Sequence, residues 1–137
     1  MFDLSVVTPE KIFYEDKINS LVIPATLGYL GVLTNHAPLL TGLVPGRITI
    51  KDQQGKRRIL AVSGGFTEVL KNRVTVLADA VEFPDKIDLE RAQKALERSK
   101  QRLKSREKGI DILRATAAYR RAKNRIDIYK ALSSASE

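Results

Sequence analysis

Hydrophobic and polar residues alternate along the first part of the chain and recur at helical spacing in the last part. Alternation is clean at residues 2–7 and strict at 47–51, as expected for strands, whose successive side chains point to opposite faces of a sheet. Short segments of this kind predict an antiparallel β-sandwich or flattened barrel. The expected strands are residues 2–8, 12–14, 17–23, 47–51, 56–62, 66–70 and 73–77.

Turn-forming residues separate these strands. Residues 15–16 (Glu-Asp) predict a turn, residues 52–55 a hairpin loop, and residues 71–72 (Lys-Asn) a tight connection between two strands. The glycine pair at 64–65 indicates a β-bulge or a close approach of backbone. Residues 24–46, with three prolines and four glycines, are expected to be irregular.

Two helices are predicted after residue 86, because small and apolar residues recur there at spacings of three and four. Gly109 is expected to end the first helix in a left-handed cap, and Asp111 to open the second. Helices joined by a few residues form an antiparallel hairpin, and alanine at their seam buries little apolar area, so the hairpin is expected to be weakly held. The two stripes are Leu89, Ala92, Leu96, Ser99, Leu103 and Ala115, Ala118, Ala122, Ile126, Tyr129.

The pattern changes at residues 81–88. No valine or proline follows this stretch. Phe83 precedes a proline and is biased towards an extended conformation, so a helix should begin only after it. Asp85 and Asp88 can both accept from the free amides of a helix start. We predict a β domain at 1–85 and a helical hairpin at 86–137, with a boundary that would also suit a hinge.

Charge is unevenly distributed between these parts. Residues 1–86 carry ten Lys/Arg and nine Asp/Glu, a net charge of +1, whereas residues 87–137 carry fourteen and seven, a net charge of +7. A basic helical part suggests an acidic protein surface, a nucleic acid or a nucleotide as partner, the alternative being a solvated helix surface.

The chain lacks the residues that several classes of protein require. The chain has no cysteine for disulfides or thiolate metal sites. It has no apolar segment near ~18 residues and no signal peptide, so we expect a cytosolic or organelle-encoded protein. His36 has no visible partner that would make it a catalytic base, and neither a phosphate loop nor a serine nucleophile motif is present. We expect a monomer without ATPase activity of its own.

Three segments are more specific in combination. They are Gly28–Leu40 (GYLGVLTNHAPLL), Ser63–Val69 (SGGFTEV) and Ile87–Ala92 (IDLERA), preceded by Val-Thr-Pro-Glu at 7–10. Together and in this order they closely resemble the epsilon subunit family of the F-type ATP synthase, of the bacterial and chloroplast type. The resemblance extends from residue 6 to about residue 128, and that family's fold agrees with the one predicted above.

The resemblance implies a non-catalytic rotor subunit at the foot of the central stalk, whose β domain packs on the gamma subunit and the c-ring. It implies a peripheral membrane protein on the cytoplasmic face of a bacterial plasma membrane, or on the stromal face of a thylakoid. The matching contact candidates here are Tyr29, Leu30 and His36. For Tyr29 the alternative is an aromatic ring that packs on its own domain.

The resemblance also gives the hairpin a regulatory role. In this family the hairpin lies folded or extends up the stalk. When extended it obstructs rotation in the hydrolytic direction, with cations that face an acidic segment of the catalytic beta subunit in the alpha/beta head. The matching cations in this chain are Arg114, Arg120, Arg121, Lys123 and Arg125.

Some bacterial members bind ATP in the folded form through an Ile/Leu-Asp-x-x-Arg-Ala motif. Residues 87–92 match it fully. Arg91 and Arg98 lie seven apart and Arg121 and Arg125 four apart, so each pair shares a helix face, and guanidinium groups suit a triphosphate. The alternative is a solvated basic surface. No cofactor is required; the regulatory ATP set is Glu82, Ile87, Asp88, Arg91, Ala92, Arg98, Arg121 and Arg125.

A basic nucleic-acid-binding protein is the alternative from another class. The sequence pI near 9.9 favours it, because a basic helical arm can hold phosphates. However, the helices carry only Tyr119 and Tyr129 as aromatic residues and no recognition motif. A free-standing coiled-coil adaptor is not supported, since the helical stripes are short and rich in alanine.

Overall fold

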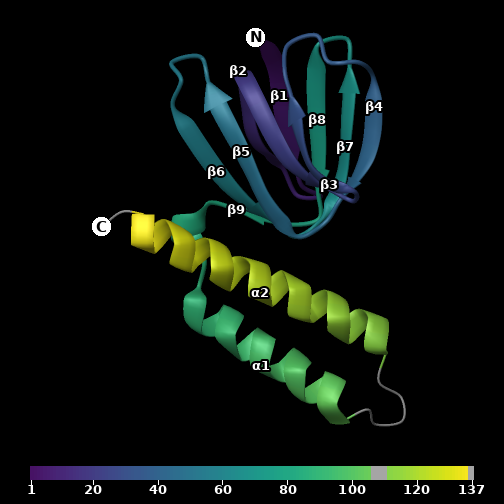
Figure 1. The fold of residues 1–137 in the computed structure, drawn as a ribbon, viewed down its shortest axis with the longest axis vertical. Helices are drawn as coiled ribbons and strands as arrows, with labels where there is room; N and C mark the ends of the chain where they lie inside the picture. The colour runs from purple at the N-terminus through teal and green to yellow at the C-terminus, as the bar shows by residue number, and fades with distance from the viewer. Residues whose placement is uncertain (106–110, 136–137) are drawn as a thin grey trace. The chain divides into compact units, whose positions relative to one another are not determined.

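The computed structural model describes residues 1–105 and 111–135, and the chain forms two compact units, Met1–Phe83 and Pro84–Glu137. The first unit is a nine-stranded β-sandwich, and the second contains two packed helices, which confirms the predicted fold class (Figure 1). The strands are β1 (Phe2–Val7), β2 (Ile12–Ala25), β3 (Gly28–Val32), β4 (Leu39–Leu43), β5 (Gly46–Asp52), β6 (Arg57–Val62), β7 (Gly65–Leu70), β8 (Arg73–Ala78) and β9 (Val81–Glu82). The second unit holds the 3-10 helix η1 (Pro84–Lys86) and the helices α1 (Leu89–Ser105) and α2 (Ile112–Ala135).

The long strand β2 belongs to both layers of the sandwich. Its first half, residues 12–18, pairs antiparallel with β1, and its second half pairs with β3 and β5. One layer continues through β1, β8, β7 and β4, and the other through β5, β6 and β9. The pairing of β1 with β8 is parallel and joins the beginning of the unit to its end.

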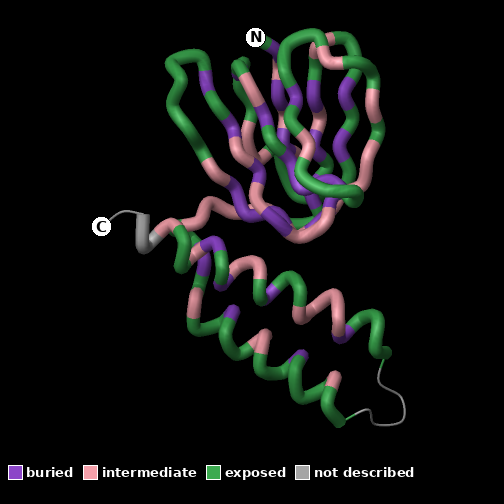
Figure 2. Tube along the Cα trace, viewed as in Figure 1, coloured by how far each residue is buried: buried purple, intermediate pink, exposed green. Residues whose placement is uncertain are grey.

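Inward side chains of the two layers form the core. Leu4, Ile18, Leu21 and Ile48 are at most 1% exposed, and buried positions alternate with accessible ones along β1 and β5 (Figure 2). Burial of one such side chain stabilises the fold by about 1.5–3 kcal/mol. The strict alternation in the sequence therefore identified core positions correctly.

Two strand predictions are wrong. Residues 15–16 do not form a turn, because Glu15 pairs with Ser5 and Asp16 with Leu4 inside the continuous strand β2. Residues 24–46 are not irregular throughout, because they contain β3 and β4. Pro24 lies within β2 although it has no amide hydrogen to donate, and its carbonyl accepts a hydrogen bond from the amide of Val44 at 2.9 Å.

The predicted connection at residues 71–72 is confirmed. Leu70 pairs with Arg73, and both Lys71 and Asn72 have positive φ angles, of 50° and 59°. Two consecutive positive φ angles are typical of a type I′ turn, whose twist matches that of the flanking strands.

The glycine pair at 64–65 is a close approach of backbone. A Cβ atom built at Gly65 would lie 2.0 Å from the carbonyl oxygen of Leu77, and Gly65 has a φ of 136°. Both facts exclude a side chain at this position.

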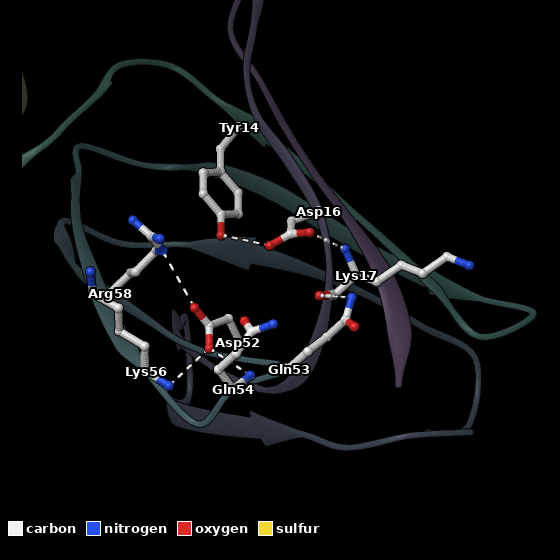
Figure 3. Close-up of polar contacts among 8 residues, drawn as sticks. All are labelled: Tyr14, Asp16, Lys17, Asp52, Gln53, Gln54, Lys56 and Arg58. Atoms are coloured by element: carbon white, nitrogen blue, oxygen red, sulfur yellow. Dashed lines mark hydrogen bonds and ion pairs between the residues drawn. The ribbon is translucent and has the colours of Figure 1, made fainter.

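The predicted hairpin loop after β5 is confirmed, and a buried carboxylate closes it (Figure 3). Asp52 is 5% exposed, and its Oδ1 accepts hydrogen bonds from the amides of Gln54 and Lys56 at 3.0 and 2.8 Å. Arg58 Nε lies 3.8 Å from the other carboxylate oxygen. These contacts satisfy a charge that would be costly to bury alone.

Of the two predicted caps Asp85 and Asp88, the structure uses Asp88 to start α1, and Asp111 starts α2 as predicted. The side chain of Asp88 accepts from the amide of Arg91 at 3.0 Å, and that of Asp111 accepts from the amide of Arg114 at 3.1 Å. Each aspartate is therefore an N-cap. The predicted cap at Gly109 lies outside the described residues.

The helices pack against each other along the two predicted stripes. Ala92, Ser99, Ala115, Ala122 and Ile126 are buried there, and the other stripe residues are half-buried. The hydroxyl of Ser99 donates within its own helix, to the carbonyl oxygens of Ala95 and Leu96.

One buried residue of α2 is absent from the predicted stripes. Ile128 is 2% exposed, although it lies about 200° around the helix from Ile126 at 100° per residue. α2 contacts η1 as well as α1, which favours apolar residues on more than one side of this helix.

Candidate functional site

The four arginines of the predicted nucleotide site occupy equivalent positions beside the helix seam. Arg91 and Arg98 each precede a buried seam residue of α1, Ala92 and Ser99. On α2 the two other arginines precede Ala122 and Ile126 in the same way. One residue corresponds to about 100° of rotation around a helix. Each of the four arginines is therefore rotated away from the seam by about this angle, in the same direction.

In an antiparallel hairpin, equal rotations from facing seams point to the same side of the pair. α1 and α2 run antiparallel (Figure 1), so the four guanidinium groups belong to one face of the hairpin. We call this the arginine face. Arg91, Arg98 and Arg121 are exposed and Arg125 is half-buried, which agrees with this placement.

The arginine face extends beyond the predicted set. Arg102 and Arg114 also precede seam positions, Leu103 and Ala115. The sequence analysis did not include Arg102 in any candidate site, although its spacing of four from Arg98 was a visible signal. Ser105 and Ile112 are joined by a few residues, so Arg102 and Arg114 lie at that end of the hairpin and Arg91 and Arg125 towards the other.

The opposite face has a different charge pattern. It includes Glu90, Glu97, Lys100, Lys104, Lys123 and Asp127, so charges of both signs are mixed there. Lys94 approaches Glu90 at 3.3 Å and Lys123 approaches Asp127 at 3.5 Å, both with i,i+4 spacing. The excess of positive charge is therefore concentrated on the arginine face.

Three residues of the Ile87–Ala92 motif have structural roles in this unit. Asp88 caps α1, Ile87 is 5% exposed and Ala92 is fully buried at the seam. The side chain of Arg91 is exposed to solvent. Glu82 belongs to β9 in the first unit, where it pairs with Ala61 of β6.

The predicted inhibitory cations divide between faces of α2. Arg114, Arg121 and Arg125 lie on the arginine face, whereas Lys123 lies on the opposite one and pairs with Asp127. Arg120 is exposed and lies on neither flank of the seam. Arg121 and Arg125 therefore belong both to this set and to the nucleotide set.

Tyr29 is bonded to its own domain and is also accessible to solvent. Its ring is 61% exposed, while its hydroxyl oxygen accepts a hydrogen bond from the amide of Arg47 at 3.2 Å. A Cβ atom at Gly46 would lie 2.9 Å from that hydroxyl and 2.5 Å from Pro24. Glycine at position 46 thus leaves room for Tyr29 to be fixed with an accessible ring.

The three predicted contact residues do not form one cluster. Tyr29 lies near the start of β3, at the end of the sandwich where β5 begins. His36 follows the end of β3, in a loop hydrogen-bonded to the β7–β8 turn. Leu30 is half-buried and packs against the core. The structure separates Tyr29 and His36 to opposite ends of β3.

An apolar outer surface on β4, β7 and β8 was missed by the sequence analysis. Phe66 lies opposite Leu77 on one side and Gly42 on the other, and Leu40 lies diagonally across from Phe66 and Leu70. The four large side chains are 45–71% exposed. The sequence of β7 has apolar residues at outward as well as inward positions, and this pattern could have indicated the surface. We call Leu40, Phe66, Leu70 and Leu77 the outer apolar face.

Residues 1–105 and 111–135 contain neither a candidate membrane-spanning helix nor a candidate metal site. None of the described helices is both long and apolar enough to cross a membrane. The described residues also contain no group of three or more His, Cys, Asp or Glu side chains that would suit a metal ion.

Comparisons with known proteins address both units. Residues 1–84 match the family model "ATP synthase, Delta/Epsilon chain, beta-sandwich domain", and residues 85–130 match "ATP synthase, Delta/Epsilon chain, long alpha-helix domain". The ATP synthase epsilon chain of Desulforamulus reducens is 47% identical over 90% of this chain and 92% of its own length.

Solved structures agree on the fold. A chain of the Euglena gracilis mitochondrial ATP synthase (OSCP/F1/c-ring) matches with a TM-score of 0.71 at 22% identity, over 98% of this chain and 80% of its own. A chain of the Tetrahymena thermophila mitochondrial ATP synthase (central stalk/c-ring) gives 0.61 at 17% identity, over 95% and 94%. The family models and the bacterial relative establish the family as well as the fold. This chain belongs to the ATP synthase epsilon chains of bacterial type, which are non-catalytic subunits of the central stalk.

Proposed function

We propose that the sandwich of this subunit joins the gamma subunit to the c-ring, and that the hairpin restrains ATP hydrolysis unless ATP holds it folded. The observation that carries the regulatory part is the arginine face. Four arginines of the motif set, from two helices, occupy the same seam-flanking position on one side of the hairpin. That arrangement requires the folded hairpin.

The arginine face destabilises the folded hairpin when no anion is bound. Like charges on adjacent helices repel each other, and the buried seam residues between them are, apart from Ile126, alanine or serine. A triphosphate placed between the arginines would convert this repulsion into attraction. A charge-assisted hydrogen bond contributes about 1.5–3 kcal/mol, so a few of them are enough to bias a weakly packed hairpin.

ATP shifts the equilibrium only through its different affinity for the two forms. An extended arrangement would separate Arg91 and Arg98 on α1 from Arg121 and Arg125 on α2, and should bind ATP poorly. The same Arg121 and Arg125 are candidates for the contact with the acidic segment of the beta subunit. One side chain cannot serve both partners at once, so ATP binding and inhibition would exclude each other.

The sandwich offers two surfaces for the permanent contacts. We assign the outer apolar face to the gamma subunit, because an exposed group of four large apolar side chains is typical of a protein interface. We assign the Tyr29 end to the c-ring, since a fixed hydroxyl presents an accessible aromatic ring there. A subunit held on the c-ring would be a peripheral membrane protein, on the cytoplasmic face in a bacterium.

Calorimetry on the full chain tests the nucleotide site. One ATP should bind, and Arg91→Ala and Arg121→Ala should each weaken binding about tenfold or more, equivalent to about 1.4 kcal/mol. Arg120→Ala is the matched control, because Arg120 is exposed on α2 but lies off the arginine face. If ATP shows no binding near a concentration of about 1 mM, the sensor role is wrong.

Truncation after Asp85 tests the mechanical role separately. The assembled complex should still couple proton flow to synthesis but hydrolyse ATP faster, because the obstructing hairpin is absent. Unchanged hydrolysis would show that the hairpin is not inhibitory in this enzyme. Loss of the truncated subunit from the complex would show that the sandwich alone does not provide the gamma and c-ring contacts.

A further inference from the structure

Asn72 connects three segments of the sandwich that are far apart in sequence. Its side-chain Oδ1 accepts a hydrogen bond from the amide of Asn35 at 2.8 Å, and its Nδ2 donates one to the carbonyl oxygen of Met1 at 2.9 Å. Its backbone carbonyl accepts from the amide of Asp3 at 3.3 Å. The β7–β8 turn is thereby tied to the beginning of β1 and to the loop after β3.

The residue type fits this position on two grounds. Asn72 has a φ of 59°, and asparagine tolerates this left-handed conformation better than most residues other than glycine. A carboxamide also provides a donor and an acceptor together, and both are used. Glycine would satisfy the turn and aspartate would keep only the acceptor, so asparagine is the residue that meets both requirements.

The loop that Asn72 holds contains His36. This loop, residues 33–38, has an unusual backbone, because Asn35 has a φ of 58°. The amide of His36 donates to the carbonyl of Leu33 at 3.2 Å, which closes a turn. Two contacts from other segments hold this loop. Asn72 accepts from the amide of Asn35, and the terminal amine of Met1, to which Asn72 is itself bonded, donates to the hydroxyl oxygen of Thr34 at 2.8 Å.

The ring of His36 has a defined hydrogen-bonding role. Its Nδ1 lies 2.7 Å from the carbonyl oxygen of Ala37. A carbonyl oxygen only accepts hydrogen bonds, so Nδ1 carries the proton that it donates. The other ring nitrogen, Nε2, is then the one that a partner can contact. His36 is half-buried, and this nitrogen suits a polar group of a neighbouring protein.

We propose that Asn72 is a positioning residue for the rotor contact of this subunit. It holds the loop at residues 33–38, which leads directly into Leu40 of the outer apolar face assigned to the gamma subunit, so that His36 presents Nε2 to a polar group of gamma. This inference rests on the proposed contact role of His36. Asn72 itself acts through the loop and does not need to touch the partner.

Hydrogen exchange on the full chain tests the positioning step without any partner. Asn72→Gly keeps the positive φ of the turn and removes the carboxamide, so thermal stability should change little. The amide of Asn35 should then exchange about tenfold faster or more, because its acceptor is lost. Asn72→Asp keeps an acceptor and should preserve the protection. If the Asn35 amide stays protected in Asn72→Gly, the proposal is wrong.

Binding to the complex without its epsilon subunit tests the contact. Asn72→Gly should weaken binding by up to about tenfold, the usual limit for one neutral hydrogen bond. His36→Gln places an amide near the Nε2 position and should bind almost normally, whereas His36→Asn reaches only the Nδ1 position and should bind as weakly as Asn72→Gly. The double variant, Asn72→Gly with His36→Asn, should be no weaker than either single variant.

The two experiments separate the two claims. Unchanged binding of His36→Asn would refute the proposed contact of His36, whatever the exchange rates show. Weak binding of His36→Asn together with normal binding of Asn72→Gly would refute the role of Asn72 alone. Loss of thermal stability in Asn72→Gly that matches its loss of affinity would reduce Asn72 to a purely structural residue.

Discussion

The sandwich and the hairpin are held together by different kinds of side chain. The sandwich buries large aliphatic residues such as Leu4 and Ile18 almost completely, whereas the buried seam residues of the hairpin are, apart from Ile126, alanine or serine. A buried leucine or isoleucine contributes about 1.5–3 kcal/mol, and a methylene-sized group only about 0.8 kcal/mol. The hairpin should therefore be the first part of the chain to melt.

Charge reinforces this difference. Residues 1–86 carry a net charge of +1 and residues 87–137 carry +7, with arginines gathered on one face of the hairpin. From a weak seam and a repulsive surface we expect the stability of the folded hairpin to depend on anions more than that of the sandwich does. Under the proposed function, the sandwich is a stable anchor and the hairpin a responsive element.

The largest effect is expected from Gly65→Ala in the sandwich. The new methyl group would collide with the carbonyl of Leu77, and its φ of 136° is unfavourable for alanine. We expect a loss of about 3 kcal/mol or more, from overpacking and backbone strain together, measured by denaturant unfolding. Gly31→Ala is the control, because no described heavy atom lies within 4 Å of a Cβ built there. Equal stability of the two variants would contradict this account.

Removal of an N-cap in the hairpin should cost less free energy of unfolding than Gly65→Ala does. It should nevertheless remove a larger share of the stability of its own unit. Asp88→Ala and Asp111→Ala should each cost about 1 kcal/mol, and the weak seam leaves little stability to absorb it. Helical circular dichroism should therefore fall at a lower temperature, while the sandwich transition stays in place. Asp127→Ala, which removes only an exposed ion pair with Lys123, should shift it much less. A common shift of both transitions would mean that the two units unfold together.

A buried hydroxyl offers a way to stabilise the sandwich. In residues 1–105 and 111–135, the buried Oγ1 of Thr67 has no hydrogen-bond partner. Thr67→Val replaces it with a methyl group of similar size and should raise stability by about 1 kcal/mol, by removing an unsatisfied polar group. Thr75→Val on the outward face of β8 is the control and should change less. A loss of stability in Thr67→Val would indicate that the hydroxyl is satisfied.

The smallest effect concerns alkaline pH. Burial, followed by the nearby charge of Asp16, raises the pKa of Tyr14 above its ordinary value, which is about 10. The folded state thus holds this proton more tightly, and the resulting stability is complete below about pH 10 and lost as the pH rises through the folded pKa. Tyr14→Phe should show a flatter decline in unfolding free energy above about pH 10. An identical decline in both proteins would exclude Tyr14 as its source.

Features set by local chemistry were predictable from the sequence. The caps at Asp88 and Asp111 and the turn at residues 71–72 depend on residues within a few positions of each other. The seam stripes follow from helical periodicity for the same reason. Interactions between residues that are close in sequence therefore produce patterns that can be recognised in the sequence.

Features set by distant pairing were not predictable. The polar pair at residues 15–16 has the composition of a turn, yet its backbone pairs with β1, and nothing local reveals that pairing. The outer apolar face arises because β4, β7 and β8 lie side by side. The arginines of the nucleotide set were identified from the sequence, but their common face depends on the antiparallel packing of two helices.

The parallel pairing of β1 with β8 also has a consequence for the order of folding. Residues 3–7 pair with residues 73–77, so the sandwich cannot be completed until almost the whole unit has been synthesised. Contacts of such long sequence separation are slow to form, whereas the hairpin depends on contacts between helices adjacent in sequence. Until β8 arrives, β1 and β7 each lack a strand partner along one edge. A newly made chain would therefore expose pairing edges that the finished rotor subunit conceals, and aggregation should be most severe in variants that delay the arrival of β8.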